Sequence, residues 1–426
     1  MDRSLQPPLK PIEEFAFPVP CKHRLTNGIP LYVLKAGLEE VVRLDVLVRG
    51  GQWNEQVPLQ AVFANTMLRE GTESLSASAI ARKIDEHGAW IEFSTASSCN
   101  FITLYCLKKH FGELLPLLYD MLTSPLYPQR QLSLLAKNQK ARFLVNNHRV
   151  KTLASREMNR LLFGEEHPAG RPKRAQDYDN LKREDLVEYY KKYYRTSNMT
   201  LYLSGFADKE CVDAVNRVLG EPGWGEGDSF DMQPFLPKPC SEPAQRSCIT
   251  LQGALQSSVT MGRWVMAPDH PDYEAFRFLA ILFGGYFGSR LMMNIREAKG
   301  YTYGIWSGIV PFMGTSQFLI SCEADNRYVE PLIEEIYKEM ERMVTEPVPQ
   351  EELEMVRNYA MGEFLRDFDG PLSAADVYTM MQSTGKDEAS LYRYFETIKK
   401  MNADRLMELS KRYLQPAQMQ VVIAGR

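Results

Sequence analysis

The sequence predicts an α+β protein built from two similar halves that follow one another along the chain. Three observations lead to this prediction: a segment that recurs at a constant offset, a linker-like stretch near the middle, and strand patterns interleaved with helix patterns. The 426 residues exceed one ordinary domain and suit two domains of roughly 200 residues each. The apolar share of 44% is sufficient for sizeable cores.

The repeat joins residues 186–205 (LVEYYKKYYRTSNMTLYLSG) to residues 406–425 (LMELSKRYLQPAQMQVVIAG) without a gap. At an offset of 220 residues, identical amino acids form the pairs Leu186 and Leu406, Glu188 and Glu408, Lys191 and Lys411, Tyr193 and Tyr413, Met199 and Met419, and Gly205 and Gly425. Each copy has the pattern of an amphipathic helix that ends in basic residues, followed by a turn and an apolar strand. Two copies of one unit indicate two related halves.

The stretch between the two copies is rich in glycine, proline and acidic residues, a composition typical of linkers. We place a first domain at residues 1–225, a linker at 226–246 and a second domain at 247–426.

Inside each half, strand and helix patterns alternate. Residues 41–50 and 257–266 alternate like half-buried strands, whereas residues 76–87 and 329–345 have helical periodicity. The segment GGYFGSR (284–290) follows a helical pattern and lacks the G-K-[ST] of a phosphate loop. We therefore exclude nucleotide binding.

Charge and composition exclude further classes of protein. The net charge of −4, without a basic stripe, argues against nucleic-acid binding. The first 20 residues contain five prolines and no apolar core of a signal peptide, and no apolar run is long enough to span a membrane. We expect a bacterial cytoplasmic protein, or a periplasmic one if a signal peptide has been trimmed.

The seven cysteines are odd in number and lack C-x-x-C spacing, which argues against a zinc ribbon or a disulfide framework. We interpret them as buried thiols in a reducing compartment.

Six segments occur in an order and spacing that covers nearly the whole chain. They are LTNGIPLYVL (25–34), RGGQWNE (49–55), MLREGT (67–72), FGEEHPAGRP (163–172), YYRTSNMTLYLSG (193–205) and GSRLMMNIREAKGYTYGI (288–305). Together they resemble the insulinase/pitrilysin family of zinc metallopeptidases, and specifically its two-subunit branch, which includes the mitochondrial processing peptidases. The resemblance implies that each half packs helices against a mainly antiparallel sheet, and that the halves together form a metallohydrolase-like half-clamshell.

Active members of this family carry an H-x-x-E-H motif, in which two histidines bind zinc and the glutamate acts as general base. The resemblance places Val62 and Thr66 at the histidine positions and Asn65 at the position of the base. Valine has no lone pair to donate, and asparagine cannot take a proton near neutral pH. The third ligand of the family is also missing, because residues 131–156 contain no Asp or Glu. We therefore expect no metal and no cofactor in this chain, and zinc only in a partner subunit.

The histidines offer no obvious substitute for the lost zinc site. They are His23, His87, His110, His148, His167 and His270, and no two of them are three or four residues apart. We interpret each as a surface or satisfied core residue, and His167, in an HP-x-G-R segment, as structural. A zinc site assembled from residues far apart in the sequence is the alternative.

The second half keeps a different signature. In the two-subunit enzymes that this chain resembles, the subunit without zinc contributes an Arg and a Tyr seven residues apart, and Arg296 and Tyr303 have that spacing. A guanidinium and a phenol are suited to donate hydrogen bonds to a peptide carbonyl that gains negative charge. Gly284, Gly285 and Gly288 correspond to a glycine-rich loop that lies against the partner in the family, where they would allow close backbone approach or a positive φ.

The resemblance implies a non-catalytic subunit of a heterodimeric zinc metallopeptidase, inactive alone, which helps an H-x-x-E-H-bearing partner to bind and orient peptides. Bound peptides would add a strand to a sheet edge. The alternatives are a structural scaffold of the same family, and a peptide-binding protein or homodimer that has no peptidase partner.

Overall fold

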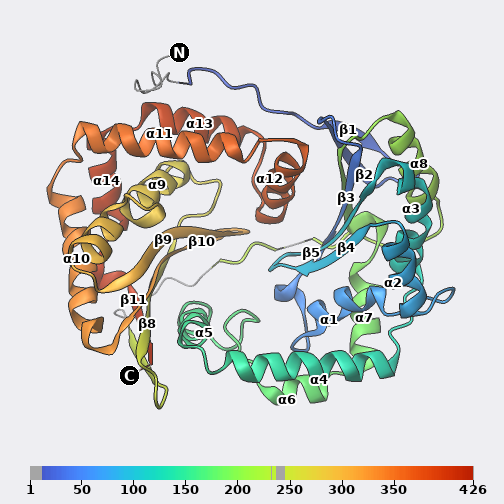
Figure 1. Ribbon diagram of the computed structural model, residues 1–426, viewed down its shortest axis with the longest axis horizontal. Helices are drawn as coiled ribbons and strands as arrows, with labels where there is room; N and C mark the ends of the chain where they lie inside the picture. Colours follow the sequence, from blue (N-terminus) through green and yellow to red (C-terminus); the bar gives the residue numbers. More distant parts are fainter. Residues whose placement is uncertain (1–11, 232, 237–244, 426) are drawn as a thin grey trace.

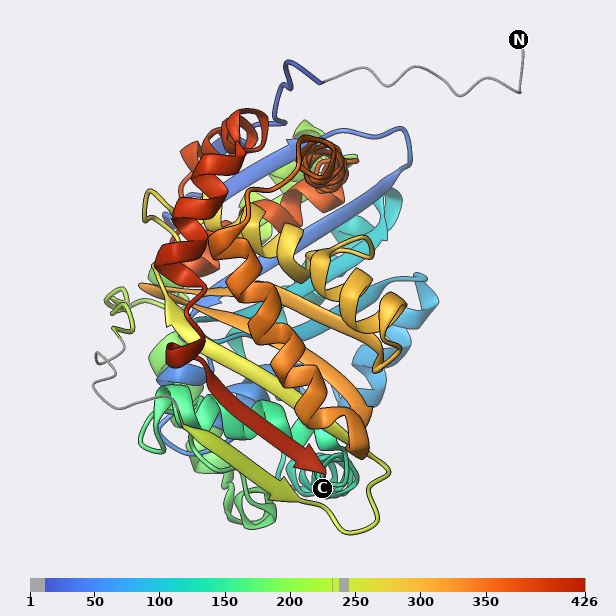
Figure 2. The same cartoon turned by 90° about the vertical axis from the view of Figure 1, so that its left-hand side faces the viewer.

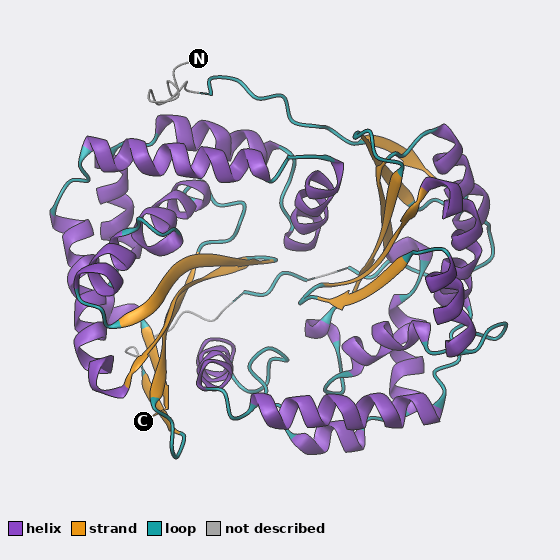
Figure 3. Ribbon diagram, viewed as in Figure 1, coloured by secondary structure: helices purple, strands orange, loops and turns teal. Residues whose placement is uncertain are grey.

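The computed structural model describes residues 12–231, 233–236 and 245–425, and it confirms the α+β prediction. Two sheets, each with its own helices, stand on opposite sides of the molecule (Figures 1 and 3). The first half supplies a six-stranded sheet and the second half a five-stranded sheet. Within the described ranges, no helix combines the length and the apolar character that crossing a bilayer requires.

The first sheet has the strand order β1-β2-β6-β3-β5-β4, and every neighbouring pair is antiparallel except β2 with β6. Its strands are β1 (Cys21–Arg24), β2 (Pro30–Lys35), β3 (Val41–Arg49), β4 (Trp90–Thr95), β5 (Cys99–Leu107) and β6 (Met199–Gly205). The order leaves β1 and β4 at the edges. β4 therefore presents unpaired backbone groups on its outer side.

The helices of the first half cover one face of this sheet and extend below it. They are α1 (Gln60–Thr66), α2 (Ala77–Glu86), α3 (Lys108–Thr123), α4 (Gln129–Asn146), α5 (Val150–Phe163), α6 (Ala175–Asn180), α7 (Arg183–Tyr193) and α8 (Lys209–Leu219), with short turns η1 (Gln52–Asn54), η2 (Met67–Arg69) and η3 (Thr196–Asn198). Because α3 and α8 turn apolar faces inward, one continuous core forms between the helices and the sheet.

The second sheet has the order β7-β11-β8-β10-β9, with only β7 and β11 parallel. Its strands are β7 (Arg246–Thr250), β8 (Gln256–Val265), β9 (Thr302–Phe312), β10 (Thr315–Asp325) and β11 (Gln420–Gly425). Here β9 is an edge strand. Both sheets are thus mainly antiparallel, as predicted.

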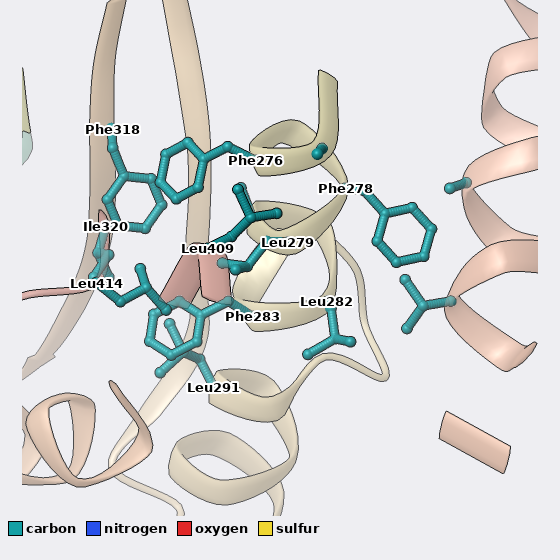
Figure 4. Close-up of a cluster of buried hydrophobic side chains, with 14 of the residues drawn as sticks. Phe276, Phe278, Leu279, Leu282, Phe283, Leu291, Phe318, Ile320, Leu409 and Leu414 are labelled. Carbon is teal, nitrogen blue, oxygen red and sulfur yellow. The ribbon is translucent and has the colours of Figure 1, made fainter. Parts of the chain in front are cut away.

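The second half contributes the helices named next, most of which lie across the outer face of this sheet (Figure 2). They are α9 (Tyr273–Ala280), η4 (Ile281–Gly285), η5 (Met292–Ala298), η6 (Asn326–Tyr328), α10 (Val329–Thr345), α11 (Gln350–Arg366), α12 (Pro371–Thr384), α13 (Ala389–Lys400), α14 (Ala403–Tyr413) and η7 (Pro416–Gln418). In the core, Phe276 and Phe283 turn toward Phe318 on β10, whereas Phe278 and Leu282 point to the opposite side (Figure 4). The α9–η4 segment is therefore buried all round.

The sequence repeat is confirmed as a structural repeat. Residues 186–205 lie in α7, η3 and β6, and residues 406–425 lie in α14, η7 and β11. In each half, the repeated strand joins the interior of its sheet, beside β3 or beside β8. The helix-turn-strand unit read from the sequence is thus the central element of both halves.

The two halves exchange a helix. Although α5 belongs to the first half, it packs on β8 and β11 of the second sheet, where Ala154 and Met158 are buried against Val422 and Ala424. In return, α12 from the second half packs on β6, β2 and β3 of the first sheet. Each sheet therefore completes its core with a helix from the other half.

The exchange corrects one detail predicted from the sequence. The alternating pattern of residues 41–50 indicated a half-buried strand, but Arg43 and Asp45 are buried as well as the apolar residues of β3. α12 covers the polar face of the strand, so both faces are closed to solvent.

The predicted domain boundaries lie in a part of the chain that the structure describes only in part. α8 ends at Leu219 and β7 begins at Arg246, and the predicted linker, 226–246, lies between them. Residues 232 and 237–244 of that linker, and residues 1–11 of the predicted first domain, fall outside the described residues.

Candidate functional site

Helix α1 carries the three residues at the predicted zinc-motif positions. Val62 and Thr66 are half-buried, whereas Asn65 is 0% exposed. The Asn65 Nδ2 donates to the backbone carbonyl of Ser94 on β4 at 2.7 Å, and its Oδ1 accepts from the Tyr194 hydroxyl at 2.9 Å. At the place where the family has its general base, this chain has a side chain that binds α1 to the sheet.

Burial keeps the proton of the Tyr194–Asn65 hydrogen bond on the Tyr194 hydroxyl. It raises the pKa of Tyr194 well above its usual value, so the phenol stays protonated and donates to Asn65. Asn65 Nδ2 also lies 3.3 Å from the carbonyl oxygen of Phe101 on β5. A neutral amide with all its polar atoms engaged can neither activate water nor bind a metal ion. In this structure Asn65 thus links α1 to β4, β5 and Tyr194.

Arg296 and Tyr303 lie on two consecutive elements, η5 and the first residues of β9. The guanidinium of Arg296 pairs with Glu297 at 2.7 Å and stacks over the exposed Phe287 ring at 4.2 Å from its centroid. Tyr303 is 91% exposed, so its hydroxyl is open to a ligand. The joint role of Arg296 and Tyr303 stays a prediction.

Tyr303 borders a cavity of about 700 Å³ that lies between α5 and the second sheet. Lys151 and Ser155 of α5 line one side, and Tyr303 and Trp306 of β9 line the other. A volume of this size holds several amino-acid side chains. Because β9 is an edge strand, backbone groups and the exposed phenol are presented at the same place.

The glycines before this site allow a close approach. A Cβ at Gly284 would lie 2.9 Å from the backbone nitrogen of Ser307 on β9 and 2.7 Å from its Oγ. Gly284, Gly285 and Gly288 have φ angles outside the positive region, so close packing of η4 against β9, rather than a left-handed turn, accounts for Gly284. Contact of these glycines with a partner stays a prediction.

An aromatic cluster joins the halves beside α5. Phe163, at the end of α5, stacks on His167 with the ring centroids 4.8 Å apart. His167 also contacts Trp53 of the first half and Phe235 of the predicted linker. The pKa of His167 is lowered to about 4, mainly because the ring is partly buried and to a lesser extent because the positive charge of Arg171 is nearby. His167 is therefore neutral at pH 7 and is packed as part of an aromatic cluster, in agreement with its structural interpretation.

Two polar groupings were not predicted from the sequence. In one, the buried Arg43 pairs with the buried Asp45 and with the exposed Asp376, which links β3 to α12. The other brings His87 together with His110 and Glu113 on the outer side of the first half. A search for paired histidines misses the second grouping, whereas the H-x-x-E spacing of His110 and Glu113 in a helix could have indicated it.

Comparisons with known proteins bear on the family and the fold. Residues 180–359 match the model of the peptidase M16 inactive domain. An uncharacterized zinc protease of Rickettsia bellii is 22% identical over 78% of this chain and 80% of its own length. A non-peptidase homolog of Helicobacter pylori is 22% identical over 72% of this chain and 70% of its own length.

Two further similarities extend this result. Subunit alpha-1 of the mitochondrial-processing peptidase of Dictyostelium discoideum is 24% identical over 55% of this chain and 35% of its own length. The crystal structure of a peptidase M16 inactive domain from Pseudomonas fluorescens superposes with a TM-score of 0.84 at 21% identity, covering 95% of this chain and 98% of that one. The superposition shows a common fold.

Proposed function

We propose that this chain is a non-catalytic subunit that helps a zinc-bearing partner to hold peptides, and the match of residues 180–359 to the peptidase M16 inactive domain supports this role. The single observation that carries the proposal is the state of α1. Asn65 stands at the position of the base and is fully committed to Ser94 and Tyr194, while Val62 and Thr66 supply no metal ligand.

The second half supports the peptide-holding part of the proposal. Tyr303 is exposed on the edge strand β9, beside the cavity bordered by α5. A peptide that reaches this cavity meets a phenol donor and unpaired strand backbone. Arg296, one element earlier, carries the charge that would orient a carbonyl or a carboxylate after leaving Glu297.

The chemistry that this chain does not provide indicates what the partner must supply. Hydrolysis requires a metal-bound water and a base that this α1 does not provide. We propose a homologous chain with an intact H-x-x-E-H motif as the partner, with zinc held by that chain. The relationship to an alpha subunit of a processing peptidase supports a two-chain arrangement.

The test mixes this chain with the nearest H-x-x-E-H relative from its source organism and follows cleavage of a quenched fluorescent peptide. We expect no cleavage by this chain alone and cleavage in the mixture. Loss of a donor that stabilises the transition state typically lowers turnover by about 100-fold, so Tyr303→Phe should reduce the rate of the mixture by about that factor. The same experiment on Arg296→Ala tests the second donor.

Tyr392→Phe is the matched control, because Tyr392 is also an exposed tyrosine but lies on α13. It should leave the rate unchanged. Turnover by the isolated chain would overturn the proposal. A stable complex without cleavage would favour a scaffold, and peptide affinity of the isolated chain with no effect of mixing would favour a peptide-binding protein without a peptidase partner.

A further inference from the structure

Three potential metal ligands meet on the outer side of the first half. His87 follows the last residue of α2, and His110 and Glu113 lie one turn apart in the first part of α3. One ligand atom from each residue lies within 4.8 Å of the others. Among the residues that the structure describes, this is the only group of three such side chains with that geometry.

The hydrogen bonds of His87 prepare one nitrogen for a cation. Its Nδ1 lies 2.6 Å from the backbone carbonyl oxygen of Lys83, which accepts a hydrogen bond from a protonated Nδ1. The His87 Nε2 lies 2.9 Å from the Glu113 Oε2, a hydrogen bond that requires a proton on Nε2, and a divalent cation would take the place of that proton between the two atoms. A backbone carbonyl that holds the distal ring nitrogen is the usual support of a metal-binding histidine.

The other two side chains, His110 and Glu113, can reach a metal ion bound at His87 Nε2. The His110 ring lies 4.8 Å from the His87 ring at an interplanar angle of 83°, so the two imidazoles are already packed together. The Glu113 side chain, which pairs with His87, is 68% exposed and can adjust without disturbing the core. Zinc binds such nitrogens and oxygens at about 2.0–2.2 Å, which places tetrahedral ligands about 3.4 Å apart. The widest separation of 4.8 Å therefore has to shorten by about 1.4 Å to assemble the site.

We propose that His87, His110 and Glu113 bind a divalent transition-metal ion of the zinc class. Two imidazoles and one carboxylate favour zinc, nickel or copper over magnesium or calcium. The ion would tie the end of α2 to α3. Because only Gly88 and Ala89 separate His87 from β4, it would also hold the start of that edge strand. None of the three ligands lies on α1, η5 or β9, so the site is separate from the peptide-holding role.

The experiment titrates zinc chloride into the full-length chain after treatment with EDTA, using isothermal titration calorimetry in a non-chelating buffer. We expect one ion per chain. His110→Phe keeps a ring against His87 but removes a ligand, and Glu113→Gln removes the carboxylate at an exposed position. Each should weaken zinc binding by roughly 10- to 100-fold or more. Magnesium chloride should give no saturable heat.

His148→Gln serves as the matched control, because His148 is an exposed histidine outside the cluster, in the turn before α5. Its zinc affinity should equal that of the unaltered chain. Visible absorption of bound Co²⁺ provides a second measurement, since the spectrum depends on inner-sphere ligands and should be lost in both variants. No saturable zinc binding, or equal affinity in Glu113→Gln and the unaltered chain, would overturn the proposal.

Discussion

Helices α5 and α12 occupy corresponding places in the two halves, yet they contact the opposite sheets through different side chains. Around α5 the contact is apolar, with Met158 and Ala154 buried against Val422 and Ala424. A Cβ at Gly262 of β8 would lie 3.0 Å from the Met158 sulfur, so this glycine lets the helix approach closely. Polar contact is confined largely to the border, where Ser247 donates to Glu157 at 2.6 Å.

Around α12, several polar bonds accompany the apolar packing of Ala374 and Ala375 near Leu34 and Tyr202. Arg43 of β3 reaches the Asp376 carboxylate at 2.5 Å, and the Tyr202 hydroxyl donates to Gln382 Oε1 at 2.6 Å. Gln382 in turn donates to the Thr200 hydroxyl at 2.8 Å. Apolar packing tolerates small shifts of a helix, whereas directional bonds to buried groups fix its position. The α5 contact therefore tolerates small shifts of the helix, whereas the α12 contact holds its helix in one position.

The largest expected effect comes from breaking the polar contact at Arg43. Arg43→Met leaves Asp45, which is 1% exposed, without its counter-charge. Removing one member of a buried ion pair costs about 4 kcal/mol, so the free energy of unfolding in urea should fall by about that amount.

Two further variants control this experiment. Adding Asp45→Leu to Arg43→Met should recover most of the loss, because the uncompensated charge is then gone. Arg327→Met removes one member of an exposed pair with Asp325 and should change stability by less than about 0.5 kcal/mol. A double variant no more stable than Arg43→Met would contradict the assignment of the cost to the buried charge.

The apolar contact gives the next largest effect. Met158→Ala removes a side chain that is 1% exposed and leaves a cavity between α5 and the second sheet. We expect a loss of about 3 kcal/mol in the free energy of unfolding. Met158→Leu keeps the volume and should cost less than about 1.5 kcal/mol. Equal losses in the two variants would mean that cavity formation is not the cause.

The smallest expected effect is a change of stability with pH, caused by His167, which stacks on Phe163 at the end of α5. The pKa of His167 is lowered to about 4 in the folded chain, compared with about 6.5 in the unfolded chain. Between these values the unfolded state binds more protons, so the contribution of neutral His167 is present above pH 6.5 and is lost as the pH falls toward 4. Allowing for partial exposure to solvent, we expect a loss of about 1 kcal/mol between pH 7 and pH 5.

His167→Phe keeps the aromatic packing on Phe163 and removes the proton. The difference in unfolding free energy between this variant and the unaltered chain should therefore change by about 1 kcal/mol over the same pH range. A constant difference would show that protonation of His167 does not cause the pH dependence.

Much of the fold could be predicted because the local patterns and the final environment agree. Residues 329–345 form α10 as predicted, and the repeated unit forms the same elements twice. The exchange of helices could not be predicted, since the apolar stripe of α5 shows that one face is buried but not which sheet covers it. For the same reason, Arg43 and Asp45 resembled the solvent face of a strand.

In the candidate site, too, some features could be predicted from the sequence and others depend on the fold. The assignment of Val62, Asn65 and Thr66 to the zinc-motif positions rests on the sequence alone and stays a prediction, whereas the contacts of Asn65 with Ser94 and Tyr194 depend on the fold. His87 lies 23 residues from His110, and only the packing of α2 beside α3 brings the two rings together.

The contacts of Asn65 also bear on whether catalysis could be restored. The amide nitrogen points at the carbonyl oxygens of Ser94 and Phe101. A glutamate placed there would direct a carboxylate at the same electron-rich atoms, with the Tyr194 hydroxyl as a donor on the other side. A glutamate at position 65 would therefore be repelled by these carbonyl oxygens, so an H-x-x-E-H motif in α1 would also require different contacts beneath the helix.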